Sequence, residues 1–151
     1  SEILGRESIG TGVVGFNFTD DPLSLKDYIK VDIAISAGKI VLSNNCTGIL
    51  MSTTVAKTYS IQRGIENKAE FRPNEHDILS DVMANYGINV MLVKIRALTN
   101  ELYYANLVLR RGDDLLNLDV KPSDAIAIAS RFKSPAYVSN DLLARMGQNV
   151  C

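Results

Sequence analysis

The chain of 151 residues lacks long hydrophobic runs, and this absence excludes a typical membrane-spanning helix. Such a helix needs about 18 or more consecutive apolar residues, and no run here approaches that length. The first residues, Ser1 to Ser8, also lack the charged and then apolar layout of a signal peptide. The sequence therefore favours an intracellular, cytoplasmic protein with no membrane partner.

Cysteine is equally scarce, because the chain has only Cys46 and Cys151. Two cysteines this far apart in sequence are too few for a disulfide framework or a zinc cluster, so we expect free thiols. Asn17 and Asn45 each begin a glycosylation acceptor pattern. That pattern matters only in a secreted chain, and we set it aside.

Neither sign of charge is in excess, since 16 Lys and Arg face 17 Asp and Glu for a net charge of -1. Phosphate contacts supply most non-specific affinity for nucleic acid, so the chain has no overall attraction to a polyanion. Any binding of DNA or RNA must be local. The contents of 46% hydrophobic and 22% charged residues are ordinary for one globular domain with its own core.

Residues 1–26 are rich in Gly, Asp, Ser and Thr, and we predict a partly irregular N-terminal arm. Within it, Gly10-x-Gly12-x-x-Gly15 matches the spacing of a dinucleotide-binding fingerprint. A true fingerprint follows a strand and opens a helix, and the sequence predicts neither here. We therefore expect no nucleotide cofactor.

Apolar periodicity in the rest of the chain predicts strands mixed with helices. The predicted strands are 31–36, 39–42, 49–51, 88–98, 101–109, 115–120 and 136–139. The predicted helices are 55–65, 75–86, 122–133 and 141–146. Because strict β-α-β alternation is absent, we predict a single α+β domain over 27–147, followed by a tail, 148–151. Its sheet should be mixed and largely antiparallel, a hairpin plus a three-strand meander, with three to four packed helices.

The second predicted helix has the clearest start signal. Asn74 is placed to cap it, with Asp77 in its first turn, and Gly87 is placed to stop it. The residues that we predict to face inward are Ile78, Leu79, Val82 and Met83. This pattern predicts an amphipathic helix on the core.

Residues 119–129 convert a strand into a helix and collect polar groups at the junction. Pro122 suits the first helical turn, and Ser123 or Asp124 can cap the free amides there. The same helix start can instead hold an anion such as phosphate. Asp119 and Asp124 could share a divalent cation, Mg²⁺ or Mn²⁺, if the turn is tight.

Two stretches carry a resemblance to a known family. The first is Arg72-Pro73-Asn74-Glu75-His76-Asp77-Ile78-Leu79. The second joins Tyr103-Tyr104-Ala105-Asn106-Leu107 to Leu118-Asp119-Val120-Lys121-Pro122-Ser123-Asp124-Ala125-Ile126-Ala127. Their residues, order and spacing resemble the bifunctional nuclease domain family, also catalogued as a domain of unknown function. The resemblance extends from Ile49 to Gly147.

The resemblance implies a compact mixed α/β domain, often a homodimer, with nuclease activity on DNA and RNA attributed to plant members. Lys57 stands where the family has an early helical Glu, and Lys121 stands where Arg is common. If that Glu is a metal ligand or a base, this chain lacks it. These two differences from the family pattern therefore affect the expectation of nuclease activity more than the expectation of the fold.

Phosphodiester hydrolysis generally needs a metal held by carboxylates, or an acid and base beside cations. The catalytic candidates are His76, Asp77, Asp119 and Asp124, of which Asp119 and Asp124 are also the candidate metal ligands. The candidate substrate-binding residues are Arg72, Lys121 and Ser123. Two readings remain open: a nuclease, or a non-enzymatic dimeric module in which these groups cap helices or bind a small anion. Convergence of the acids and the imidazole on one open cleft would favour the nuclease.

For other polar and aromatic residues, the sequence gives weaker evidence of a role in nucleic-acid binding. Arg110 and Arg111 can contact phosphate but more often mark a solvated strand end. Tyr103 and Tyr104 alternate faces on a strand, so one of them can stack on a base, although core packing or a dimer contact explains them as well.

Overall fold

A computed structural model describes residues 21–68 and 72–151, which form one α+β domain. The helices are α1 (Val55–Ile65), α2 (Glu75–Asn85), α3 (Pro122–Arg131) and α4 (Asn140–Met146). The strands are β1 (Tyr28–Ser36), β2 (Lys39–Asn44), β3 (Thr47–Ser52), β4 (Asn89–Thr99), β5 (Leu102–Arg111), β6 (Asp114–Val120), β7 (Ala136–Ser139) and β8 (Gln148–Asn149). The glycines of the fingerprint pattern lie outside the described residues.

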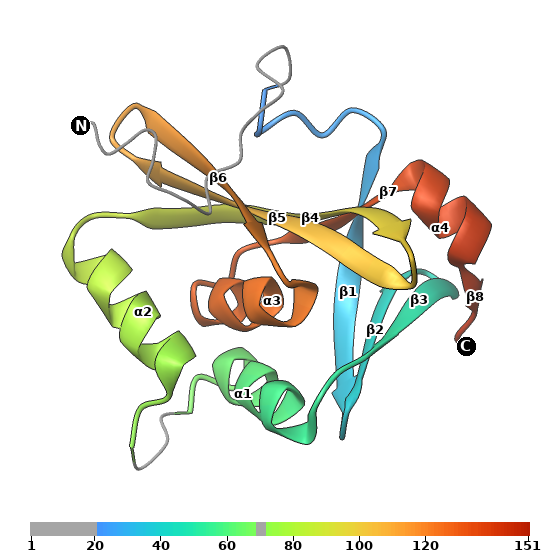
Figure 1. The fold of residues 1–151 in the computed structure, drawn as a ribbon, viewed down its shortest axis with the longest axis horizontal. Coiled ribbons are helices and arrows are strands. Elements are labelled where there is room, and N and C mark those ends of the chain that lie inside the picture. Colours follow the sequence, from blue (N-terminus) through green and yellow to red (C-terminus); the bar gives the residue numbers. More distant parts are fainter. Residues whose placement is uncertain (1–20, 69–71) are drawn as a thin grey trace.

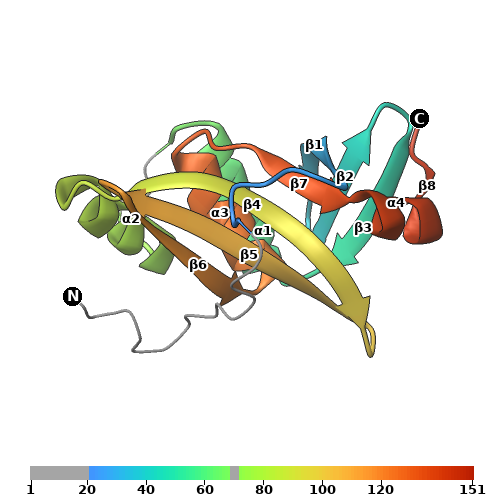
Figure 2. The ribbon, with the colours of Figure 1, turned by 90° about the horizontal axis from the view of Figure 1, so that it is seen from above.

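The eight strands of the described ranges belong to one sheet in the order β6-β5-β4-β7-β1-β2-β3-β8. The pairings are antiparallel except that β4 and β7 run parallel. This arrangement confirms the predicted α+β class and the largely antiparallel mixed sheet. Figures 1 and 2 show α1, α2 and α3 on one side of the β4–β5 part of the sheet, whereas α4 lies at the other end near β3 and β8.

Helix α3 is the most enclosed helix because it lies between the sheet and α1 (Figure 1). Every residue from Ala125 to Ser130 is buried. A helix that is apolar on all sides suits such a position, and its alanines leave room for neighbours. The polar residues of α3 are therefore left at its two ends.

The prediction for the inward face of α2 is wrong for most of its residues. Met83 is buried, but Ile78 is 54%, Leu79 45% and Val82 47% exposed. Helix α2 instead buries His76 and Ser80 beside Met83. The physical reason is that hydrogen bonds to His76 fix the rotation of α2, so part of its apolar face points to solvent.

The prediction of free thiols is also wrong, since Cys46 and Cys151 form a disulfide with a Cα–Cα distance of 5.1 Å. The expected C-terminal tail contains β8, which pairs with β3 at Thr47. The Val150 N–H also donates to the Cys46 carbonyl at 2.9 Å. Pairing along a sheet edge thus brings the two cysteines together despite a sequence separation of 105.

Two predicted helix starts are confirmed. Asn74 and Asp77 form a reciprocal capping box at α2, and Pro122 begins α3. None of the helices in the described ranges is long and apolar enough to cross a membrane.

Candidate functional site

Three helices bring an imidazole, a carboxylate, an ammonium and a hydroxyl together. His76, in the first turn of α2, has Nδ1 at 2.7 Å from the Ser60 Oγ of α1 and Nε2 at 2.9 Å from the Asp124 Oδ1 of α3. The Lys57 Nζ of α1 donates to the same Asp124 oxygen at 2.6 Å. We call Lys57, Ser60, His76 and Asp124 the polar cluster.

Local sequence explains why these side chains point at one another. Lys57 and Ser60 are three residues apart on α1 and so share a face of that helix. The capping box at Asn74 fixes the first turn of α2, which directs His76 inward. Asp124 lies in the first turn of α3, and from there its side chain reaches residues of α1 and α2.

Arg131 extends the polar cluster along α3. Its guanidinium donates to Asp77 Oδ1 at 2.7 Å, to the Ser60 carbonyl at 3.1 Å and to Ser60 Oγ at 3.0 Å. The Asn74 amide also donates to Ser60 Oγ, at 2.9 Å. Helices α1, α2 and α3 are therefore joined by one continuous hydrogen-bond network.

This network fixes the tautomer of His76. The Ser60 oxygen has two lone pairs, and the donors Asn74 and Arg131 occupy both of them. The Ser60 hydroxyl must therefore donate its own proton to His76 Nδ1. With Nδ1 as acceptor, the imidazole carries its proton on Nε2 and donates it to Asp124.

The two carboxylates of the network are held ionised. Burial raises the pKa of Asp124, but hydrogen bonds from Lys57 and His76 and the charge of Lys57 outweigh it, so the pKa lies below the ordinary value. Burial likewise raises the pKa of Asp77, but the hydrogen bond from the Asn74 amide and the contact with Arg131 lower it by more, so it lies below the ordinary value. Both groups are therefore negatively charged acceptors at neutral pH.

These shifts predict a loss of stability in acid. Because the folded-state pKa values lie below the ordinary value of 3.8, the unfolded chain binds protons first as the pH falls. The stability that these two carboxylates contribute should be fully present above about pH 5 and decline below about pH 4. Urea denaturation at several pH values would measure it. Asp124→Asn should decline less steeply, and an equal slope in that variant would contradict the assignment.

A small hollow of about 180 Å³ opens beside the network. The residues that line it are Arg63, Gly64, Asn67, Lys68, Asp77 and Arg131. Three of them are cations and one is an acid, Asp77, which Arg131 neutralises. Lys68 also pairs with Glu66, just outside the lining, at 3.4 Å. The lining keeps a small excess of positive charge, which can attract a small anion such as a phosphate group.

Asp119 does not join the polar cluster. Leu118 and Val120 pack on the core, so Asp119 between them points to the opposite face of the sheet. Its carboxylate lies 3.7 Å from Arg96 on β4. Asp119 and Asp124 therefore do not face each other across the turn.

The remaining candidates fall outside the polar cluster. Arg72 and Lys121 are exposed, and Ser123 is buried. Lys121 occupies the N-cap of α3, where no side chain makes a cap hydrogen bond, and Asp124 binds Lys57 and His76 instead. The interpretation of Asp124 as a plain helix cap is therefore wrong.

The aromatic and strand-end candidates also lie apart from the polar cluster. Tyr103 packs against the core, where burial raises its pKa, and Tyr104 lies under the Arg96 guanidinium at 5.4 Å. Arg110 is partly buried and Arg111 exposed at the end of β5.

Sequence reasoning missed Ser60 and Arg131 and noticed Lys57 only as a departure from a pattern. Ser60 lies within an ordinary helical stretch and gives no signal. Arg131 lies seven residues after Asp124 and so on the same face of α3, a spacing that could have identified it. Partners from different helices cannot be paired from sequence alone.

A comparison with protein-family models matches residues 40–150 to the bifunctional nuclease domain. The chain belongs to this family. The match includes all four residues of the polar cluster and the cationic hollow. Family membership confirms the resemblance carried by the two motifs around His76 and Asp124.

Several curated relatives are similar to the chain. Bifunctional nuclease 2 of Arabidopsis thaliana is 33% identical over 109 residues, which cover 69% of this chain and 33% of that protein. Bifunctional nuclease 1 of Oryza sativa subsp. indica is 31% identical over 107 residues, 68% of this chain and 32% of that protein. An uncharacterized protein of Mycobacterium tuberculosis is 35% identical over 86 residues, 57% of this chain and 49% of its own. The chain thus spans a third to a half of these relatives.

The polar cluster does not fit a divalent metal held by carboxylates. Asp124 Oδ1 already binds both Lys57 and His76, and both ring nitrogens of His76 are engaged. Among the described residues, no group of three or more His, Cys, Asp or Glu side chains could hold a metal ion. The ammonium of Lys57 occupies the place beside Asp124 that a cation would take.

Proposed function

We propose that this bifunctional nuclease domain hydrolyses phosphodiester bonds of DNA or RNA, and that it does so without a metal held by carboxylates. Relatives named bifunctional nuclease support the reaction class. The observation that carries the proposal is the contiguity of a cationic hollow with a network that ends in an ionised acid, Asp124, and an ammonium, Lys57.

Each end of the network has a separate task in this proposal. The hollow beside Arg63 and Lys68 would attract one phosphate of the polynucleotide by charge, while Arg131 stays bonded to Asp77 and Ser60. At the other end, Asp124 would accept a proton from water as the water oxygen forms its bond to phosphorus, because His76 and Lys57 keep the carboxylate ionised and oriented. The phosphorus–oxygen bond to the leaving sugar oxygen breaks, and that oxygen takes a proton from solvent. Lys57 would stabilise the negative charge that develops on the phosphate under attack.

The proposal predicts cleavage that survives removal of metals. The purified chain should cleave fluorescently labelled single-stranded DNA or RNA at a similar rate in excess EDTA and in Mg²⁺ or Mn²⁺. Asp119→Asn should leave that rate unchanged, because Asp119 lies on the other face of the sheet. Strict dependence on a divalent ion, or loss of cleavage in Asp119→Asn, would contradict the proposal, and so would the absence of any cleavage.

A second candidate function is a non-enzymatic homodimeric module, and two observations favour it. His76 and Ser60 are fully engaged within the network, which thereby locks the helices. Exposed apolar side chains on α2 and at its C-cap, including Val82 at 47% and Tyr86 at 73%, could pack against a second copy. Light scattering of the chain and of Val82→Lys would detect a dimer that depends on this face. A dimer without cleavage would favour this candidate.

A further inference from the structure

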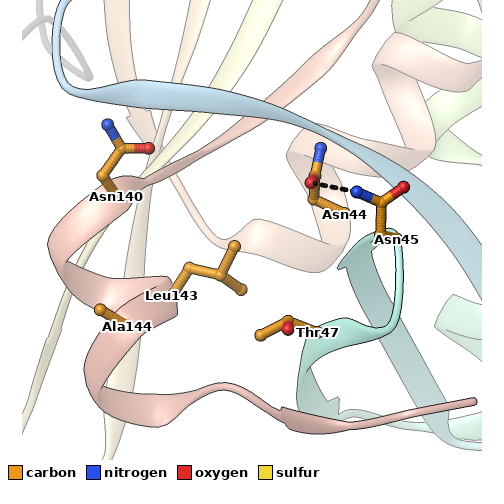
Figure 3. Close-up of a pocket in the computed structure, with 6 residues that line it drawn as sticks. All are labelled: Asn44, Asn45, Thr47, Asn140, Leu143 and Ala144. Atoms are coloured by element: carbon orange, nitrogen blue, oxygen red, sulfur yellow. Dashed lines mark hydrogen bonds between the residues drawn. The ribbon is translucent and has the colours of Figure 1, made fainter.

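A second hollow lies at the end of the molecule away from the polar cluster. It has a volume of about 310 Å³ and opens between α4 and the turn that joins β2 to β3 (Figure 3). The residues that line it are Asn44, Asn45, Thr47, Asn140, Leu143 and Ala144. The volume is at the lower end of the range for small-molecule sites.

The lining combines amides with an apolar patch. It contains three carboxamides and a hydroxyl but no charged side chain, and Leu143 extends into the space between them (Figure 3). The Asn44 amide is oriented, since its Nδ2 donates to the Lys30 carbonyl at 3.1 Å and its Oδ1 accepts from Asn45 at 3.4 Å. Donors and acceptors thus stand beside an apolar wall.

A covalent link and a sheet edge hold the two walls at a fixed spacing. Cys46 lies between Asn45 and Thr47 in one wall and is bonded to Cys151, which follows the other wall through β8. The chain passes close by at Gly147, where an added Cβ would lie 2.7 Å from the Thr47 methyl. The disulfide therefore ties the turn that carries Asn44, Asn45 and Thr47 to the segment that follows α4.

We propose that this hollow binds a neutral nucleobase and that the Cys46–Cys151 disulfide holds it in the binding shape. A carboxamide can match the adjacent donor and acceptor on the edge of a base, as Asn does with adenine. Ala144 and the small exposed part of Leu143, which is 9% exposed, would contact one ring face. The absence of charged residues in the lining gives no partner to a phosphate or a carboxylate.

The inference deepens the proposed function by giving a nucleic-acid substrate a second contact, but its test is independent of cleavage. A nucleoside has no phosphodiester bond, so its binding measures only the hollow. Failure of cleavage with retained nucleoside binding would remove the nuclease proposal and leave this one standing.

The experiment is a titration of the oxidised chain with adenosine, cytidine and, as a sugar control, ribose, followed by ¹H–¹⁵N spectra. The side-chain amides of Asn44, Asn45 and Asn140 should shift with the nucleosides and not with ribose. Asn140→Ala should weaken binding by about three- to tenfold, the loss of one neutral hydrogen bond. Asn85→Ala, on the exposed face of α2, is the matched control and should bind normally.

The disulfide is tested with a variant that carries both Cys46→Ser and Cys151→Ser. Its ¹H–¹⁵N spectrum should show that the β4–β6 part of the sheet stays folded. Its affinity for nucleosides should fall by at least the factor seen in Asn140→Ala. Equal affinity in this variant and the oxidised chain would overturn the role of the disulfide. Absence of nucleoside binding, or equal shifts with ribose, would overturn the nucleobase site itself.

Discussion

Arg131→Met should lower the free energy of unfolding by about 3–5 kcal/mol, the usual cost of removing one partner of a buried ion pair. The Arg131 side chain is 10% exposed and its partner Asp77 22%. Methionine keeps most of the aliphatic packing of the arginine side chain, so the decrease in the free energy of unfolding measures the loss of its ion pair and hydrogen bonds. Without Arg131, the Asp77 carboxylate and the Ser60 carbonyl lose their donor between the helices. Urea denaturation at pH 7 would measure the change.

The matched control is Arg145→Met on α4. Arg145 also pairs with an aspartate, Asp141, but both side chains are more than half exposed. A surface pair of this kind contributes about 0.3–0.5 kcal/mol, so the control should unfold almost normally. Similar losses in the two variants would show that Arg131 does not join the helices as described.

Asp124→Asn should reduce phosphodiester cleavage by about 100- to 10,000-fold, the range for loss of a general acid or base. The amide keeps the shape of the side chain and can still accept from His76, but it loses the negative charge that attracts Lys57. Initial rates on a labelled oligonucleotide, in the presence of EDTA, would measure the change. Loss of rate without a change in substrate affinity would assign Asp124 to the chemical step.

Two comparisons keep this prediction separate from a folding defect. Asp141→Asn removes an exposed carboxylate on α4 and should cleave at the normal rate. The Asp124→Asn protein should also retain the spectrum of the folded chain at the assay temperature. A folded Asp124→Asn protein with a normal rate would place the chemistry elsewhere or trace it to a contaminant.

Most of the fold could be predicted because local signals agreed with it. The capping box at Asn74 and the proline at Pro122 mark helix starts by backbone chemistry alone, and both helices begin there. The parallel pairing of β7 with β4 could not be predicted, since a strand of four residues carries no information about a distant partner. Rotation of α2 also depended on tertiary contacts, because the His76 hydrogen bonds outweighed the apolar pattern.

The site was predictable only in part for the same reason. His76 and Asp124 were recognised from two motifs, and the fold brings them to 2.9 Å. Asp119 was predicted to face Asp124, but its neighbours Leu118 and Val120 point to the core. Successive residues of a strand point to opposite faces of the sheet, so Asp119 points away from the polar cluster. Lys57 comes from α1, and Arg131, although it shares a face of α3 with Asp124, bonds residues of α1 and α2, so only the folded chain shows that both complete the network.

The cysteines show a similar limit. Sequence separation gave no reason to pair Cys46 with Cys151, yet a two-residue strand brings them together. The cytoplasmic location stays a prediction, and the disulfide weighs against it because reducing compartments rarely keep such bonds.

The state of the imidazole tests the central claim most directly, that one network joins three helices and aims His76 at Asp124. The chain has a single histidine, so the ring gives one unambiguous set of ¹H–¹⁵N signals. At neutral pH the network predicts a proton on Nε2 and an unprotonated, hydrogen-bonded Nδ1. Ser60→Ala should change the Nδ1 signal, because it removes the donor. A proton on Nδ1, or a ring signal indifferent to Ser60, would contradict the account.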